Sequence, residues 1–168
     1  GDGPMYAEIL AYVKAKSLTV YLTDVNASKP LESEQVIFTG YQNNPYKFIK
    51  NATILIIAST AEGGPNVIQE SMICETLVVS TDCPSGPREI IAPDAVPGKL
   101  DRSYVGDYGV LLPMIMNNRY EETIDHWATI IEEYFMNEQK REAVVKNAKK
   151  WVSKQSAKDI VEQWEKII

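Results

Sequence analysis

Residues 62–70, Glu-Gly-Gly-Pro-Asn-Val-Ile-Gln-Glu, closely follow an apolar run at residues 54–58. A run that is apolar at every position predicts a strand buried on both faces of a parallel sheet. Pro65 suits the first position of a helix, because a residue there has no intrahelical N–H bond to lose, and Gly64 is then the expected N-cap. The stretch therefore predicts a strand, a glycine-rich turn and a helix, in that order.

The start of this helix has the chemistry of a phosphate site. The backbone N–H groups of Asn66 and Val67 lack intrahelical partners, and the helix dipole adds roughly half a positive charge. Glu70 shares a helix face with Asn66, about 6 Å further along the axis. Glu62 and Glu70 are both good acceptors for sugar hydroxyls. Taken alone, such a stretch is more often a capped surface helix with two solvated glutamates.

A second segment of the same kind favours the site. Residues 77–81 form another apolar run, and residues 82–90 read Asp-Cys-Pro-Ser-Gly-Pro-Arg-Glu-Ile. Here Ser85 or Gly86 is the expected N-cap, with Pro87 at the first helical position. The carboxyl ends of parallel strands meet at one edge of a sheet, where ligands bind. We therefore expect Glu62, the amides of residues 66 and 67, and Gly86 to line one cleft, with Glu70 on its rim.

These two segments closely resemble the C-terminal domain of family 4 retaining glycosyltransferases, the group 1 transferases of the two-domain GT-B type. Weaker matches lie at residues 1–4 (Gly-Asp-Gly-Pro), 36–52 and 109–113. The resemblance implies an α/β fold with a Rossmann-like parallel sheet and helices on both faces. It also implies the function of the whole protein, which is sugar transfer from a nucleotide diphosphate with retention of configuration.

The resemblance implies a role for each matching position. Glu62 corresponds to the catalytic-site glutamate that meets the hydroxyls of the donor sugar, and Glu70 to the residue that holds the ribose. The donor-binding loop matches Gly63, Gly64, Asn66 and Val67, and Gly86 lies in the neighbouring loop. The family uses no metal and no cofactor, and this chain has no Asp-x-Asp site.

Three departures from the family pattern concern regions beside these positions. Glu75 stands where the family has a glycine that ends the helix in a left-handed conformation, so this cap is expected to be strained or rebuilt. Residues 17–35 form a longer link, in which residues 19–23 read as either a short strand or a loop. Residues 93–107 read as an insertion rich in proline, glycine and charge.

A larger departure concerns the N-terminal half of the family fold. The resemblance implies an acceptor-binding N-terminal domain, two central strands and a basic Arg–Lys pair, and none of them matches this chain. We expect residues 1–168 to be a fragment, the C-terminal nucleotide-sugar-binding domain, with C-terminal helices over 120–168. Without the two strands, the strand at 36–39 should be separated from the others. The chain alone should be inactive.

Composition fits one globular piece. The chain has 168 residues, of which 45% are hydrophobic and 24% charged, values typical of a folded soluble domain. A net charge of −6 argues against nucleic acid as a partner. Two cysteines indicate a reducing compartment, and with one histidine they predict no metal site. His126 falls within a predicted helix, which favours a packing or surface role over a catalytic one.

The predicted function is donor binding in a hexosyltransferase of bacterial surface polysaccharide or glycolipid synthesis. The expected location is the cytoplasm, with peripheral contact to the inner face of the membrane through the missing half. Two alternatives stay open, a sugar-nucleotide 2-epimerase half and a non-catalytic partner-binding module. The predicted strands are 36–39, 53–58, 77–80 and 109–112, and the predicted helices are 4–16, 45–50, 65–74, 87–91, 120–135, 138–152 and 156–167.

Overall fold

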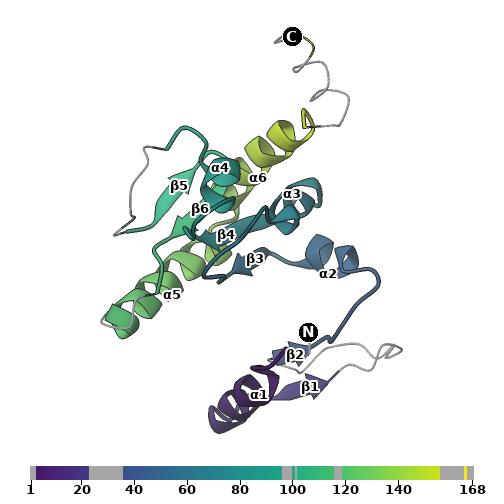
Figure 1. Cartoon of the computed structure of the whole chain (residues 1–168), viewed down its shortest axis with the longest axis vertical. Coiled ribbons are helices and arrows are strands. Elements are labelled where there is room, and N and C mark those ends of the chain that lie inside the picture. The colour runs from purple at the N-terminus through teal and green to yellow at the C-terminus, as the bar shows by residue number, and fades with distance from the viewer. Residues whose placement is uncertain are drawn as a thin grey trace. The chain divides into compact units, whose positions relative to one another are not determined.

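The computed structural model of the chain describes residues 3–22, 36–95, 100, 102–115, 119–155 and 165. It divides into two compact units, residues 1–45 and residues 46–168 (Figure 1). The smaller unit holds helix α1 (Tyr6–Ala15) and two short strands, β1 (Val20–Leu22) and β2 (Val36–Phe38). The two strands pair in parallel, and the Tyr6 ring meets the Phe38 ring edge-on at 5.3 Å.

The larger unit is built on a four-stranded sheet with the order β3-β4-β6-β5. Strands β3 (Ile54–Ile57), β4 (Leu77–Thr81) and β6 (Gly109–Leu112) run parallel, and β5 (Tyr104–Gly106) is antiparallel to β6. The parallel strands are connected through helices, as parallel pairing requires. The α/β fold and the parallel pairing of β3, β4 and β6 agree with the sequence prediction, whereas the antiparallel β5 was not predicted.

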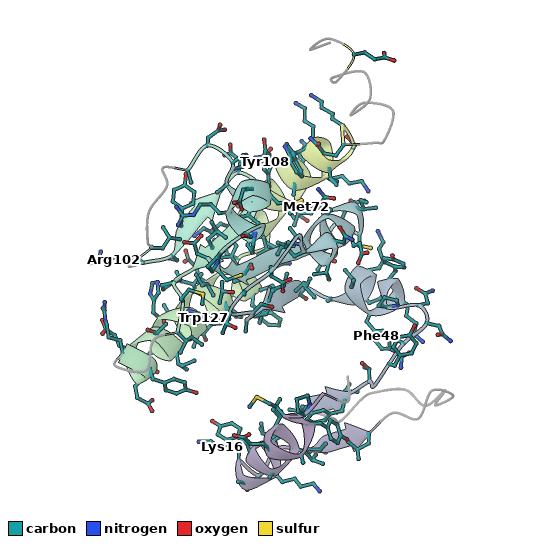
Figure 2. All side chains as sticks on the ribbon, in the orientation of Figure 1. Lys16, Phe48, Met72, Arg102, Tyr108 and Trp127 are labelled. Carbon is teal, nitrogen blue, oxygen red and sulfur yellow. The ribbon has the colours of Figure 1, made fainter. Side chains whose placement is uncertain are left out.

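Helices cover both faces of this sheet, because the central strands are apolar on both sides. On one face, α3 (Asn66–Ile73) and α4 (Pro87–Ile91) pack against Val78 and Leu111. On the other face, α5 (Tyr120–Met136) packs against Leu77, Val79, Val110 and Leu112. Figure 2 labels one core side chain from each layer, Met72 on α3 and Trp127 on α5.

Helix α6 (Glu138–Val152) reaches both layers at the amino ends of the strands. Its Val144 belongs to the α5 layer, whereas Ala148 and Val152 belong to the α3 layer. Trp151 stacks on Tyr108, which directly precedes β6, with ring centroids 5.2 Å apart. Lys149 donates from Nζ to the Ile73 carbonyl at 2.6 Å and so caps the end of α3. The helix thereby covers the edge of the sheet that faces away from the carboxyl ends.

The structure corrects several details of the sequence prediction. Residues 19–23, for which strand and loop were both open, contain β1, which pairs with β2. The separation of β2 from the larger sheet agrees with the expectation for the strand at 36–39. Residues 93–107, expected to be an insertion without strands, contain β5, which forms a tight hairpin with β6. The other predicted strands agree within one residue at each end, and the other helices, with α2 at Tyr46–Asn51, agree within two. The predicted helix at 156–167 lies outside the described residues.

Within the described residues, no helix is both long enough and apolar enough to cross a lipid bilayer. In the same residues, no group of three or more His, Cys, Asp or Glu side chains gathers as metal ligands would. His126 accepts a hydrogen bond at Nε2 from the Ser103 amide, at 3.1 Å. This bond connects α5 with the segment before β5, so His126 has a structural contact.

Glu75 ends α3 in the left-handed region, with φ 62°. The sequence leaves open a strained or a rebuilt cap here, and the structure keeps the glycine-type conformation with a residue that has a Cβ. The Glu75 carboxylate lies 3.3 Å from Lys149 Nζ, but both side chains are about half exposed, so this ion pair contributes little.

We predict that Glu75→Gly raises the free energy of unfolding by roughly 0.5–1 kcal/mol, because relief of the left-handed strain exceeds the entropy that glycine loses on folding. Urea unfolding of the chain, followed by tryptophan fluorescence, measures the change. Glu75→Ala is the control, since it removes the carboxylate and keeps the Cβ, and it should stay within about 0.5 kcal/mol of the parent. A glycine variant no more stable than the alanine variant contradicts the prediction.

Candidate functional site

The loop after β3 presents the residues that the sequence singles out. Gly63, Gly64 and Asn66 are exposed, and Glu62 and Val67 are half-buried. Gly64 has φ 155°, and Pro65, with ψ 87°, is the N-cap of α3. Gly64 is therefore not the N-cap and Pro65 is not the first helical residue. The Pro65 carbonyl instead accepts from the Ile68 amide at 3.0 Å, so the helix begins one residue later than predicted.

The loop after β4 has two consecutive residues with positive φ, Ser85 at 64° and Gly86 at 112°. Gly86 is the N-cap of α4 and Pro87 its first residue, as predicted. The Gly86 amide donates to Glu89 Oε2 at 2.8 Å. This bond is the half of a capping box that a glycine N-cap can form, since glycine has no side chain to complete the other half.

These two loops lie at the same edge of the sheet and contact each other. The Glu62 amide donates to the Pro84 carbonyl at 3.4 Å, and Thr81 Oγ1 donates to the Ser59 carbonyl at 2.6 Å. A Cβ placed on Gly86 would lie 2.4 Å from Pro65 Cδ. Only glycine allows this close approach, so Gly86 has a steric role in holding the second loop against the start of α3.

Glu70 lies one turn into α3 and is half-buried. Tyr46 on α2 donates from its hydroxyl to Glu70 Oε1 at 3.4 Å. The Glu70 carboxylate thus lies beside the Tyr46 hydroxyl group. Glu62 precedes the start of α3 in the chain and Glu70 lies within the helix. That these residues line a single cleft stays a prediction. Their ligand roles stay predictions.

The sequence did not single out Asp82 and Arg88, which connect the two ends of the second loop. Arg88 Nε donates to Asp82 Oδ1 at 2.8 Å, and a second guanidinium nitrogen bonds Asp82 Oδ2. The side chains are 17% and 8% exposed, so the pair is largely out of water. The hydrogen bond to Asp82 raises the pKa of Arg88 above its ordinary value, and burial opposes this only in part. The spacing of an acid and an arginine six residues apart was visible in the sequence, but it does not by itself indicate a pair.

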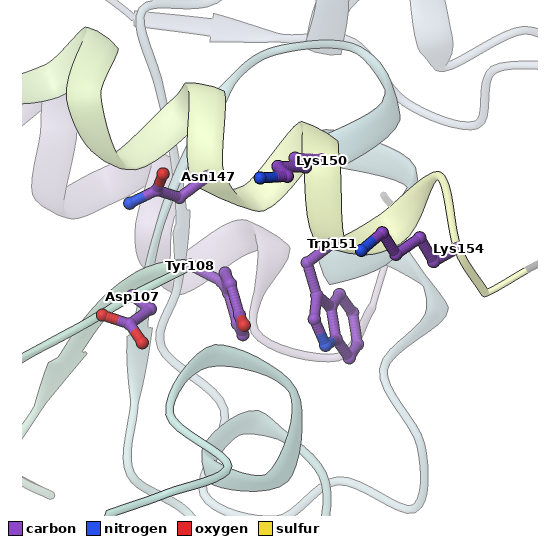
Figure 3. Close-up of a pocket in the computed structure, with 6 residues that line it drawn as sticks. All are labelled: Asp107, Tyr108, Asn147, Lys150, Trp151 and Lys154. Carbon is purple, nitrogen blue, oxygen red and sulfur yellow. The ribbon is translucent and has the colours of Figure 1, made fainter.

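A separate pocket lies at the opposite edge of the sheet, between α6 and the turn that joins β5 to β6 (Figure 3). Its volume is about 390 Å³. The stacked rings of Tyr108 and Trp151 form one side, and the lysines point along α6. The lining residues are Asp107, Tyr108, Asn147, Lys150, Trp151 and Lys154. None of them belongs to the loops described above.

Comparison with known families identifies the class of protein. The sequence profile of the family described as Glycosyl transferases group 1 matches residues 7–103, which is more than half of the chain. The chain therefore belongs to this glycosyltransferase family. The matched range includes both loops of the candidate site.

Two curated relatives are similar to this chain over part of its length. An uncharacterized glycosyltransferase of Methanocaldococcus jannaschii is 42% identical over 77 residues, 45% of this chain. The N-acetylgalactosamine-N,N'-diacetylbacillosaminyl-diphospho-undecaprenol 4-alpha-N-acetylgalactosaminyltransferase of Campylobacter jejuni is 35% identical over 94 residues, 56% of this chain. The matches span only 19% and 22% of these relatives' own lengths.

Among solved structures, the pneumococcal O-GlcNAc transferase GtfA, crystallised with UDP and GlcNAc, covers 99% of this chain with a TM-score of 0.60. The chain covers 27% of that protein, at 17% identity. This likeness concerns the fold, which agrees with the sheet and helices described above.

We predict that Gly86→Ala lowers the free energy of unfolding by about 1–3 kcal/mol, because the new Cβ meets Pro65 and the positive φ becomes strained. Gly63→Ala is the matched control, since a Cβ on Gly63 meets no atom within 4 Å. This control should change the stability by no more than about 0.5 kcal/mol. Urea unfolding of both variants measures the difference, and equal shifts would show that the contact between the loops is unimportant.

Proposed function

We propose that this chain is the donor-binding half of a glycosyltransferase that takes a sugar from a nucleotide diphosphate with retention of configuration. The observation that supports the proposal most directly is the position of two carboxylates, Glu62 and Glu70, before and after the exposed N-terminus of α3. Family membership supports the reaction class, and the match of these two positions to the family motif supports the division of roles.

The N-terminus of α3 is suited to the diphosphate. Its first amides point out of the helix without intrahelical partners, and the helix dipole favours negative charge there. Gly63 and Gly64 have no Cβ, so a phosphate can approach the backbone closely. Stabilisation of the leaving diphosphate is then the electrostatic contribution of this half to catalysis. The proposal needs no metal ion and no cofactor.

The carboxylates are suited to hydroxyl groups on the two sides of the diphosphate. Glu62, at the loop, is the partner of the donor sugar, and Glu70, one helical turn away, is the partner of the ribose. A carboxylate accepting from a hydroxyl forms the stronger, charge-assisted kind of hydrogen bond. The acceptor, as in the undecaprenol-linked substrate named for the Campylobacter relative, is a surface glycolipid or polysaccharide precursor. Its binding belongs to another domain of a cytoplasmic enzyme that meets the membrane peripherally, so the isolated chain is expected to be inactive.

The test uses the complete enzyme that contains this chain, with UDP, GDP and ADP as binding probes. Glu70→Ala should weaken binding of the preferred nucleoside diphosphate by about 1–3 kcal/mol, roughly 5- to 150-fold, since it loses hydrogen bonds to a charged group. Glu70→Gln should lose less, because one acceptor remains. Glu62→Ala should reduce sugar transfer more than nucleoside diphosphate affinity. Isothermal titration and an initial-rate transfer assay separate these effects.

Glu121→Ala is the control, because Glu121 is an exposed residue of α5 on another part of the unit. Unchanged nucleoside diphosphate affinity in both the Glu62 and the Glu70 alanine variants would refute the role assigned to Glu70, which would then be only a solvated helix residue. Epimerised donor formed without an acceptor would indicate a sugar-nucleotide epimerase instead.

A further inference from the structure

The loop between β4 and α4 has a conformation that its own residues do not favour. Ser85 has a Cβ and yet a positive φ of 64°, and it is followed by Gly86 at 112°. Two successive residues in this region persist only where surrounding contacts determine the backbone.

The two ends of the loop are joined by the side chains of Asp82 and Arg88. The guanidinium meets both carboxylate oxygens, so the contact restricts orientation as well as distance. Asp82 is itself anchored to the sheet, because its amide donates to the Leu112 carbonyl of β6 at 2.8 Å. Arg88 is in the first turn of α4, which is held in the core by the fully buried Ile91. The pair thus connects two fixed points across the loop.

Between these points, the loop contacts the candidate donor site twice. The Pro84 carbonyl accepts from the Glu62 amide, and Gly86 lies against Pro65 at the start of α3. A change in the path of residues 83–86 therefore moves the Pro84 carbonyl, which is the hydrogen-bond partner of the Glu62 amide. Misplacement by about 1 Å at a reacting centre can reduce a rate by two orders of magnitude.

We infer that Arg88 is a positioning residue for sugar transfer, which acts through Asp82 and Pro84 to hold Glu62 in place. The inference rests on the proposed function of Glu62. Arg88 acts at a distance in this arrangement and is not a catalytic residue. The role requires the planar two-nitrogen fork of arginine, which a lysine ammonium cannot reproduce.

A role in folding alone is the competing explanation. Buried ion pairs are often close to neutral for stability, because the cost of removing both charges from water offsets their attraction. A gain in stability therefore does not by itself explain why Asp82 and Arg88 form a bidentate ion pair here. The two explanations predict different behaviour for a variant that is well folded. Only a positioning role lowers the transfer rate while the affinity for the free nucleoside diphosphate is kept.

The experiment compares Arg88→Lys, Arg88→Gln, Asp82→Asn and the double variant Asp82→Asn/Arg88→Gln in the complete enzyme. The control is Arg119→Gln, which breaks a bidentate pair of the same chemistry with Glu122 at the exposed start of α5. Transfer is measured as kcat and donor KM, and UDP, GDP and ADP are the binding probes. All assays run at a temperature where the unfolding curve shows every variant to be folded.

We expect Arg88→Gln and Asp82→Asn each to lower kcat by roughly 10- to 100-fold, with at most a fewfold change in nucleoside diphosphate affinity. The double variant should be no worse than either single variant, because both remove one contact. Arg88→Lys keeps the charge but loses the fork, and it should retain most of the defect. Arg119→Gln should behave like the parent.

Each other outcome has a distinct meaning. If the parent transfers sugar and the Arg88 and Asp82 variants match Arg119→Gln, the positioning role is wrong and the proposed function stands. If kcat and nucleoside diphosphate affinity fall together in every variant, Arg88→Lys included, and both follow the loss in the free energy of unfolding, the pair is only structural and the inference is overturned. If the parent binds none of the probes and transfers no sugar, the proposed function fails, and this inference fails with it.

Discussion

Parallel pairing of β3 with β4 is the constraint on which the candidate site depends. The two strands pair from Ile54 opposite Leu77 to Ile57 opposite Ser80, so they run in the same direction and end almost level. The loops that follow them must therefore leave the same edge of the sheet. Antiparallel pairing would send one of these loops to the other edge, and Glu62 and Gly86 would be far apart. The contact between Gly86 and Pro65 is a consequence of this register.

Packing of the helices then fixes how the loops end. The buried Ile68 and Met72 hold α3 on one face of the sheet, which sets the direction of its N-terminus. At the other end of α3, the Lys149 ammonium caps the Ile73 carbonyl and so ties α3 to α6. The exposed Asn66 and the half-buried Val67 at the start of α3 can therefore face a ligand without any ligand being needed to order them. Rigid elements that support an exposed loop are the usual basis of a binding site.

Sequence patterns predicted the elements well because strongly apolar strands and proline-started helices have simple local causes. The run at residues 54–58 and Pro87 after Gly86 are examples. Contacts between segments were harder to predict. The Asp82–Arg88 pair depends on the folded path of a loop. Strand β5 was missed because it has only three residues, 104–106, and two of them are exposed. The pairing of β1 with β2 is likewise a tertiary choice, which local propensity does not determine.

Residues with positive φ in the larger unit are concentrated at the candidate site. Of its described residues with positive φ, Gly64, Ser85 and Gly86 follow β3 or β4 at the carboxyl edge, and Glu75 alone lies at the opposite edge. Glu75 has a local explanation, since it ends a helix in the usual left-handed cap. Gly64, Ser85 and Gly86 instead precede helices. They turn the chain before α3 and α4, so that backbone groups of the two loops become exposed. Such conformations are retained when the surrounding structure determines them. Here the parallel register of β3 with β4 and the Asp82–Arg88 pair fix the conformation of these loops. The site therefore depends on the sheet as well as on its own residues.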